Sequence, residues 1–189
     1  MQNQEHEPSG ARPNNIRAIN CRSAIDLFSH TNKLSVLDVS EQLRLSKTAA
    51  SNIINMLTES GLIYRCGKGA SSEFGGKKPI LYTMNPTYKY GIIVSFESQF
   101  VIAEMLDFCL NKVSYRLQET KDDTYPSAVQ AAAQAITDLK ERVNLSPEDI
   151  FAVTVQSGGI VDARNGILLR AIGSPNWDND LPVVKDLKQ

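Results

Sequence analysis

The sequence has few cysteines, no long apolar run and little net charge. Its three cysteines, Cys21, Cys66 and Cys109, are widely spaced and form no C-x-x-C pair, which argues against a disulfide framework or a zinc site. No run approaches the ~18 apolar residues that a membrane-spanning helix needs, and the polar first residues contain no signal-peptide core. We therefore expect a cytoplasmic protein with no membrane segment, no metal and a flexible tail over residues 1–13.

What the sequence does contain is typical of an ordinary globular protein. Of its 189 residues 42% are hydrophobic and 22% are charged, which is enough for one large domain or two small ones. The net charge of −1 conceals an asymmetry. Residues 1–90 carry 11 basic and 7 acidic side chains, whereas residues 91–189 carry 9 and 14. This split indicates a module that binds a polyanion, joined to a different domain.

Three helices are predicted in the first third of the chain. Apolar residues at helical spacing indicate a first helix that starts near residue 14 and ends near residue 30. A second helix starts after Ser35, because Asp38 completes a capping box. Ser46 is placed to cap a third helix, which ends at Ser60-Gly61. The residues of the third helix that follow an i, i+3, i+4, i+7 pattern and must face inward are Ala50, Ile53, Ile54 and Leu57.

The opposite face of the third helix carries small polar side chains. Two helices joined by a short turn, the second exposing such side chains, form the helix-turn-helix in which the second helix enters the major groove of DNA. Asparagine pairs with adenine, serine and threonine bind bases or phosphates, and lysine reaches a phosphate or a guanine. The alternative is a face that only contacts solvent. The candidate DNA-binding residues on this helix are Ser46, Lys47, Thr48, Ser51, Asn52 and Asn55.

Two predicted strands, residues 62–66 and 80–84, follow the helices and are separated by a stretch rich in Gly, Ser and Lys. They predict a hairpin with a basic tip, for which the alternative is a flexible solvated loop. Glycine lets backbone approach a groove closely, and paired lysines bind phosphates. Between Arg44 and Lys78 there are six basic and two acidic residues, which favours DNA as the partner. The candidate DNA-binding residues of the tip are Gly76, Lys77 and Lys78.

A turn signal at residues 85–87 separates an expected winged helix-turn-helix domain, residues 14–86, from a second domain, residues 87–189. The second domain is predicted to contain strands at residues 90–94, 101–106 and 113–117, a helix at 126–142 and a buried apolar strand at 150–155. This order indicates a mixed-sheet α/β domain. Little regular pattern follows Ser157, and an acidic turn at residues 178–180 lacks the further ligands of a metal site.

Several segments carry a family resemblance: residues 45–51 (LSKTAAS), 57–63 (LTESGLI), 75–79 (GGKKP) and 81–86 (LYTMNP). They resemble the winged-helix region of ROK-family regulators (repressor, open reading frame, kinase). In that family this region leads into a sugar-kinase-like α/β domain of the actin or ribonuclease H type. The resemblance implies that residues 87–189 form an incomplete first lobe of such a domain. The family's catalytic Asp, second phosphate loop and zinc cluster would follow Gln189.

The resemblance extends to the family's ligand site. Residues 95–99 (SFESQ) stand where ROK kinases have an Asp-x-Gly-Gly-Thr phosphate loop, so Ser95, Glu97 and Ser98 replace the acid and both glycines. These changes argue against ATP binding, and we expect no catalytic residue and no cofactor. Residues 156–162 (QSGGIVD) and 174–177 (SPNW) resemble segments beside the sugar. The candidate sugar-binding residues are therefore Gly159 and Asn176, although Asn176 could equally be a turn-forming residue after Pro175.

These observations predict a sequence-specific DNA-binding transcription regulator. We expect a repressor of carbohydrate genes that responds to a sugar or a sugar phosphate. It is expected to bind a double-stranded DNA operator as a homodimer, because palindromic sites match two-fold proteins. The alternatives are a ROK-type sugar kinase and a constitutive DNA-binding protein that senses no effector.

Overall fold

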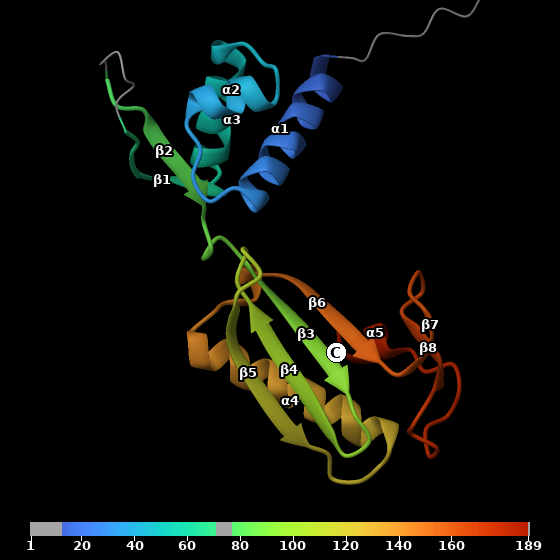
Figure 1. The fold of residues 1–189 in the computed structure, drawn as a ribbon. Helices are drawn as coiled ribbons and strands as arrows, with labels where there is room; N and C mark the ends of the chain where they lie inside the picture. The colour runs from blue at the N-terminus through green and yellow to red at the C-terminus, as the bar shows by residue number, and fades with distance from the viewer. Residues whose placement is uncertain (1–12, 71–76, 189) are drawn as a thin grey trace, which may run out of the picture. The chain divides into compact units, whose positions relative to one another are not determined.

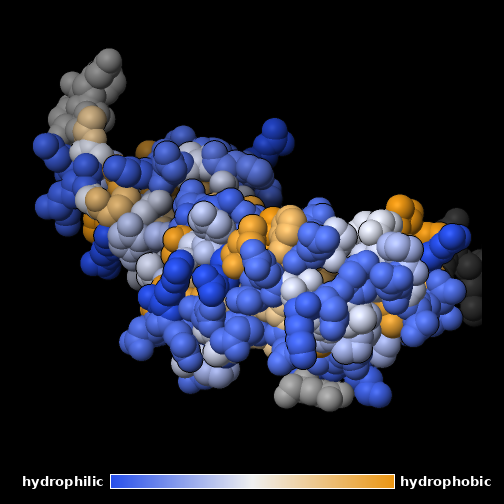
Figure 2. All heavy atoms as spheres, turned by 90° about the horizontal axis from the view of Figure 1, so that it is seen from below, coloured by the Kyte–Doolittle hydropathy of each residue, from blue (hydrophilic) through white to orange (hydrophobic). Residues whose placement is uncertain are grey.

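The computed structural model of the chain describes residues 13–70 and 77–188, which form two compact units that divide between Asn85 and Pro86 (Figure 1). The expected tail lies outside the described residues except for Pro13, where the first helix begins. Within the described part of the chain, no helix has both the length and the apolar character that crossing a bilayer requires. Hydrophilic side chains cover most of the face seen in Figure 2, and hydrophobic ones form small separate patches on it.

The first unit consists of three helices and a two-stranded hairpin. Its elements are α1 (Pro13–His30), α2 (Val36–Gln42), α3 (Lys47–Glu59), β1 (Ile63–Lys68) and β2 (Ile80–Met84). The predicted capping box is present, because the Asp38 N–H donates to Ser35 Oγ at 3.3 Å and the Ser35 N–H donates to Asp38 Oδ2 at 2.7 Å. Ser46 caps α3 by accepting a hydrogen bond from the Ala49 N–H at 3.2 Å. The helix starts predicted at these serines are confirmed.

The three helices and the hairpin of the first unit share one core. Strands β1 and β2 pair antiparallel, with Ile63 opposite Met84. The segment between α1 and α2 joins β2 through Leu34, whose N–H donates to the Tyr82 carbonyl at 3.0 Å and whose carbonyl accepts from the Tyr82 N–H at 2.9 Å. The buried apolar side chains of this core include Ala24, Phe28, Leu34, Val39, Ile54, Leu57, Ile63 and Tyr82.

The second unit is a four-stranded mixed sheet with a long helix on one face (Figure 1). Its main elements are β3 (Tyr90–Phe96), β4 (Phe100–Leu106), β5 (Lys112–Glu119), α4 (Tyr125–Val143) and β6 (Ile150–Ser157). The strand order is β5-β4-β3-β6, in which β3 pairs antiparallel with β4 and parallel with β6. Helix α4 buries Ala128, Ala132, Ala135 and Leu139 against Ile92, Val94, Val101, Ala103 and Met105 of the sheet. The mixed-sheet α/β fold class is thus confirmed.

Two parts of this unit differ from the sequence prediction. Strand β6 was predicted to be buried, but it lies at an edge of the sheet, where Phe151 and Val153 are 60% and 46% exposed. An apolar run indicates a strand but not whether another strand pairs with it. The stretch after Ser157 is also more regular than predicted. It contains an antiparallel hairpin of β7 (Gly159–Asp162) and β8 (Ile167–Ala171), and a short helix, α5 (Val183–Asp186).

Candidate nucleic-acid interface

Helix α3 has one buried face and one polar face. Ala50, Ile53, Ile54 and Leu57 are buried, as the helical spacing predicted. Thr48, Asn52 and Asn55 lie on the opposite side, and all three are exposed. Because four apolar side chains fix the buried face in the core, these polar side chains are held outward on a rigid element. That is the arrangement in which a recognition helix presents side chains to base edges.

The turn between α2 and α3 sets the direction of α3. The Ser40 hydroxyl donates to the Leu45 carbonyl at 2.7 Å, and the Leu45 N–H donates to the Ser40 carbonyl at 2.9 Å. Arg44 takes a left-handed conformation, with φ of 53°, which reverses the chain within the turn. Two hydrogen bonds between the same pair of residues restrict how far α3 can pivot against α2.

The other candidates on α3 take different positions. Lys47 is exposed in the first turn, where its ammonium group can reach a phosphate, and Ser51 is half-buried. Ser46 is exposed, but its hydroxyl oxygen already accepts the capping hydrogen bond from Ala49. Its first role is therefore to start the helix. Other N–H groups of the first turn have no partner within the helix and point outward. Such groups favour an anion.

The hairpin adds basic side chains to this unit. Arg65, Lys68, Lys77 and Lys78 are all exposed, and within the described part of the chain none of them forms an ion pair. The pairing shifts between Arg65 and Gly67, where Gly67 has φ of 146°. This irregularity gives the strand extra twist just before the tip. Gly76 lies outside the described residues.

Two polar residues of α1 line the same region and were not among the sequence candidates. A groove of about 570 Å³ runs between α1 and α3 and is lined by Arg17 and Asn20 of α1 together with Asn52 and Asn55 of α3. The Arg17 Nη2 atom donates to Met56 Sδ at 3.6 Å. Apolar periodicity could only place Arg17 and Asn20 on the polar side of α1. It could not reveal which neighbouring helix they face.

A polar hollow in the second unit lies where β3 and β6 end. It has a volume of about 390 Å³, and its lining includes Ser95, Glu97, Ser98, Gln156 and Ser174. Ligands of α/β sheets bind outside the carboxyl ends of parallel strands, beside the point where the topology switches. Ser95, Glu97 and Ser98, which the resemblance aligns with the phosphate loop of ROK kinases, thus lie together in this hollow. Its described lining contains hydroxyl, amide and carboxylate groups and no lysine or arginine.

The two sugar-site candidates lie near this hollow in sequence, but neither lines it. A Cβ atom on Gly159 would approach the Arg170 carbonyl oxygen to 2.2 Å, so a glycine is needed for β7 and β8 to pair. Asn176 is exposed, and its Nδ2 atom donates to Asp123 Oδ2 at 3.1 Å. The next residue, Trp177, packs edge-on against Phe96 with ring centroids 5.7 Å apart.

Trp177 also packs against Tyr125 at a centroid distance of 5.4 Å. The Tyr125 hydroxyl donates to Asp186 Oδ2 at 2.8 Å. Burial, together with this hydrogen bond to a carboxylate, raises the pKa of Tyr125 well above its usual range. The segment that carries Asn176 is therefore fixed to the start of α4 by aromatic packing, and α5 is fixed to the same helix by a hydrogen bond.

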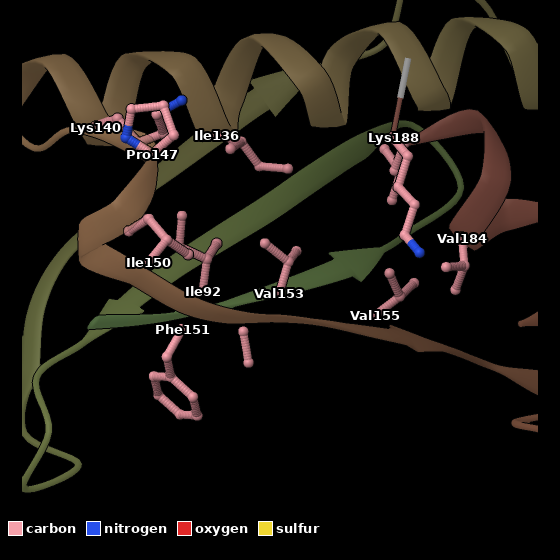
Figure 3. A pocket seen from close by; sticks show the side chains of 12 residues that line it. Ile92, Ile136, Lys140, Pro147, Ile150, Phe151, Val153, Val155, Val184 and Lys188 are labelled. Atoms are coloured by element: carbon pink, nitrogen blue, oxygen red, sulfur yellow. The ribbon is translucent and has the colours of Figure 1, made fainter. Parts of the chain in front are cut away.

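An apolar hollow of about 390 Å³ lies between α4 and β6 (Figure 3). Ile136 of α4 and Val153 and Val155 of β6 point into it, whereas Phe151 points away (Figure 3). Its lining also includes Val184 of α5 and two basic residues, Lys140 and Lys188. Apart from these two lysines, the described lining is apolar and contains no carboxylate, thiol or hydroxyl side chain. No group of three or more His, Cys, Asp or Glu in the described residues is arranged to hold a metal ion.

Comparisons with known proteins agree with this architecture. No protein-family model matches the chain. The chain is 27% identical over 147 residues to the xylose repressor of Staphylococcus xylosus. The aligned residues cover 75% of this chain and 36% of that repressor. It is 24% identical over 157 residues to the xylose repressor of Lactiplantibacillus pentosus. Here the aligned residues cover 82% of this chain and 38% of that repressor. The chain therefore spans less than half the length of these relatives.

A solved structure shares the fold. It is the crystal structure of a ROK family transcriptional regulator, a homolog of the E. coli MLC protein. The two structures superpose with a TM-score of 0.65 and 14% sequence identity. The match covers 91% of this chain and 43% of the regulator. The resemblance carried by residues 45–51, 57–63 and 81–86 is thus confirmed by relatives in sequence and by a neighbour in structure. The chain is thus similar in sequence to two xylose repressors and shares its fold with a ROK family transcriptional regulator.

Proposed function

We propose that this chain is a sequence-specific DNA-binding transcription regulator and that its first unit reads an operator. The observation that carries the proposal is the polar face of α3, on which Thr48, Asn52 and Asn55 are exposed opposite four buried apolar residues. Asparagine side chains at such positions pair with adenine in the major groove. Lys47 and the basic hairpin residues Lys77 and Lys78 supply phosphate contacts, which give most of the sequence-independent affinity.

The names of the relatives support a proposal for the direction of regulation and the class of effector. Both sequence relatives are named xylose repressors, so we propose repression of carbohydrate genes and a sugar or sugar phosphate as effector, with xylose the first sugar to test. The lining of the polar hollow, with Ser95, Ser98 and Gln156 and without a cation in its described part, supports a neutral sugar better than a phosphate. A switch requires that the sugar bind the DNA-competent and DNA-incompetent states with different affinity.

Two further properties belong to this proposal. The chain acts as a homodimer, because one winged helix reads few base pairs and a two-fold protein matches a palindromic operator. It works in the compartment that holds the operator, which is the cytoplasm in bacteria such as those of the two relatives.

The rival function from another class is a sugar kinase, because the resemblance includes kinases. Phosphoryl transfer needs the nucleotide phosphates to be held and their charge neutralised. Glu97 and Ser98 line the hollow where the family's glycines would stand, so a carboxylate faces the site of the phosphates. This arrangement favours ligand sensing over ATP chemistry. A constitutive DNA-binding protein is the other rival, and only a sugar titration separates it from a sensor.

The test is an electrophoretic mobility shift assay with the DNA upstream of the chain's own gene and an unrelated duplex of equal length. A preference for the upstream DNA that a sugar such as xylose weakens supports the proposal. Equal binding to both duplexes contradicts sequence-specific reading, and a preference that no sugar alters indicates the constitutive rival. ATP consumption that depends on a sugar would make the kinase the first choice.

A further inference from the structure

The groove between α1 and α3 opens beside the reading face of α3. Asn52 and Asn55, the two asparagines proposed to read bases, form one side of it, and Arg17 and Asn20 form the other. The N-terminal half of α1 is thus next to the side chains that would enter the major groove. In a helix-turn-helix the recognition helix lies in the major groove, which the phosphate backbones of the two strands border. A basic side chain beside the recognition helix is therefore in the region of the phosphates.

The side chain of Arg17 lies along this groove. Its Nη2 atom donates to Met56 Sδ, 3.6 Å away, so the long side chain lies across toward α3 instead of extending freely into solvent. Thioether sulfur is a weak acceptor, and a weak contact of this kind orients the guanidinium without using its stronger hydrogen-bonding capacity. The structure places no carboxylate of the described residues in an ion pair with Arg17, although Glu59 lines the same groove.

The chemistry of the groove fits a phosphate. A guanidinium carries five N–H donors in a planar fork, and this fork matches two phosphate oxygens at once. Asn20, one helical turn along α1, adds an amide that can donate to an adjacent phosphate oxygen. The groove is also lined by the carboxylate of Glu59 and by Ile16, Ala49, Ile53 and Met56. Its phosphate-binding donors are the guanidinium of Arg17 and the amides of the three asparagines.

We propose that the DNA-binding surface extends onto α1 and that Arg17 binds a backbone phosphate beside the base pairs read by α3. The inference rests on the proposed function, since it requires that α3 enter the major groove. Arg17 then sets the register of α3 on the duplex without itself reading sequence. Loss of such a contact lowers the affinity for all DNA sequences by a similar factor and removes about one counterion from the salt dependence.

The experiment compares Arg17→Ala with Arg22→Ala. Both arginines are exposed on α1, but Arg22 faces a different hollow, which Asp26 and Ser29 also line. Fluorescence anisotropy measures the Kd for the upstream DNA of the chain's own gene and for an unrelated duplex over a series of salt concentrations. We expect Arg17→Ala to weaken binding to both duplexes by about tenfold and to reduce the salt slope by about one. Arg22→Ala should bind as the parent does, and Arg17→Lys should recover part of the loss.

The outcomes separate this inference from the proposed function. If the parent binds the upstream DNA and Arg17→Ala binds it as tightly as Arg22→Ala does, the α1 contact is wrong while the reading role of α3 stands. If Arg17→Ala loses affinity only for the upstream DNA, with no change in salt slope, Arg17 contacts a base and the phosphate assignment is overturned. If the parent binds neither duplex, both the inference and the proposed function are wrong. A thermal unfolding scan of each variant checks that these exposed substitutions leave the unit folded.

Discussion

The side-chain amide of Asn176 donates a hydrogen bond to the carboxylate of Asp123, with 3.1 Å between Nδ2 and Oδ2. It connects the segment after β8 with the turn that precedes α4, although the two residues are 53 positions apart. The contact uses the donor side of the amide. Within the described residues, the Asn176 side-chain oxygen accepts no hydrogen bond that the structure shows.

The first prediction concerns this residue. If Asn176 binds the effector, Asn176→Ala should weaken sugar binding by about tenfold, which corresponds to one hydrogen bond of about 1.4 kcal/mol. Isothermal titration calorimetry with the sugar that alters DNA binding measures the change. Asn179→Ala is the control, because Asn179 is an exposed asparagine of the same segment. Equal affinities for the two variants would mean that Asn176 has only its structural contact with Asp123.

The second prediction separates base reading from phosphate binding. Asn55→Ala should cost about 1–3 kcal/mol at particular base pairs, because it removes a bidentate contact, and the same holds for Asn52→Ala. Lys77→Ala should instead weaken binding to every sequence and lower the salt slope by about one. Competition assays with single-base operator variants measure both effects. The exposed Lys121 of the second unit provides a control, and asparagine variants that keep the parent's base preferences would show that α3 does not read these positions.

The third prediction concerns acid stability. Asp162 accepts hydrogen bonds from the Asn165 side chain at 2.7 Å and from the Asn165 and Arg164 N–H groups, and these bonds lower its pKa in the folded chain. A depressed folded pKa gives stability that is present above the unfolded pKa of about 4 and is lost as the pH falls through the folded value. Asp162→Asn should therefore lower the Tm at pH 7 more than at pH 3.

Circular dichroism at the two pH values measures this difference. Asp178→Asn is the matched control, since Asp178 is an exposed aspartate to which the structure gives no hydrogen bond within the described residues. A Tm change for Asp162→Asn that is the same at pH 7 and pH 3 would mean that its hydrogen bonds contribute nothing that depends on charge.

The fourth prediction concerns the open edge of the sheet. Strand β6 contains no charged residue, whereas β5 at the opposite edge contains Lys112, Arg116 and Glu119. Charged residues protect an edge strand from pairing with another chain, so β6 is the edge at which copies should associate. Val153→Lys should reduce self-association, and Val113→Lys on β5 should not, although the two valines are similarly exposed at 46% and 44%. Sedimentation velocity at rising concentration distinguishes them, and equal association of both variants would contradict the prediction.

The helices of the first unit could be predicted from sequence because their signals are local. Ser35 with Asp38, Ser46 before α3 and the spacing of Ile53, Ile54 and Leu57 each act within one or two helical turns. The polar face of α3 follows from the same spacing, since it is the side left over when the apolar residues are buried. Which of its residues contact DNA remains a prediction.

The parts that could not be predicted depend on contacts between distant residues. The β7–β8 hairpin lies in a stretch rich in Gly, Asp and Asn. It forms because the Asp162 carboxylate accepts a hydrogen bond from the Asn165 N–H in the turn and because Gly159 permits close pairing of the two strands. The exposure of Val153 depends on which strand lies beside β6, which an apolar run does not encode. Arg17 gave no signal because its neighbour Met56 is 39 residues away.

The paired hydrogen bonds between Leu34 and Tyr82 join strand β2 to the segment between α1 and α2. Each of these residues donates its N–H to the carbonyl of the other, and both side chains are buried. The Tyr82 amide can therefore meet solvent only when the segment between α1 and α2 also opens, which is the behaviour of one cooperative unit. In deuterium exchange the two amides should therefore report the same opening free energy, because strand β2 and the segment between α1 and α2 open together.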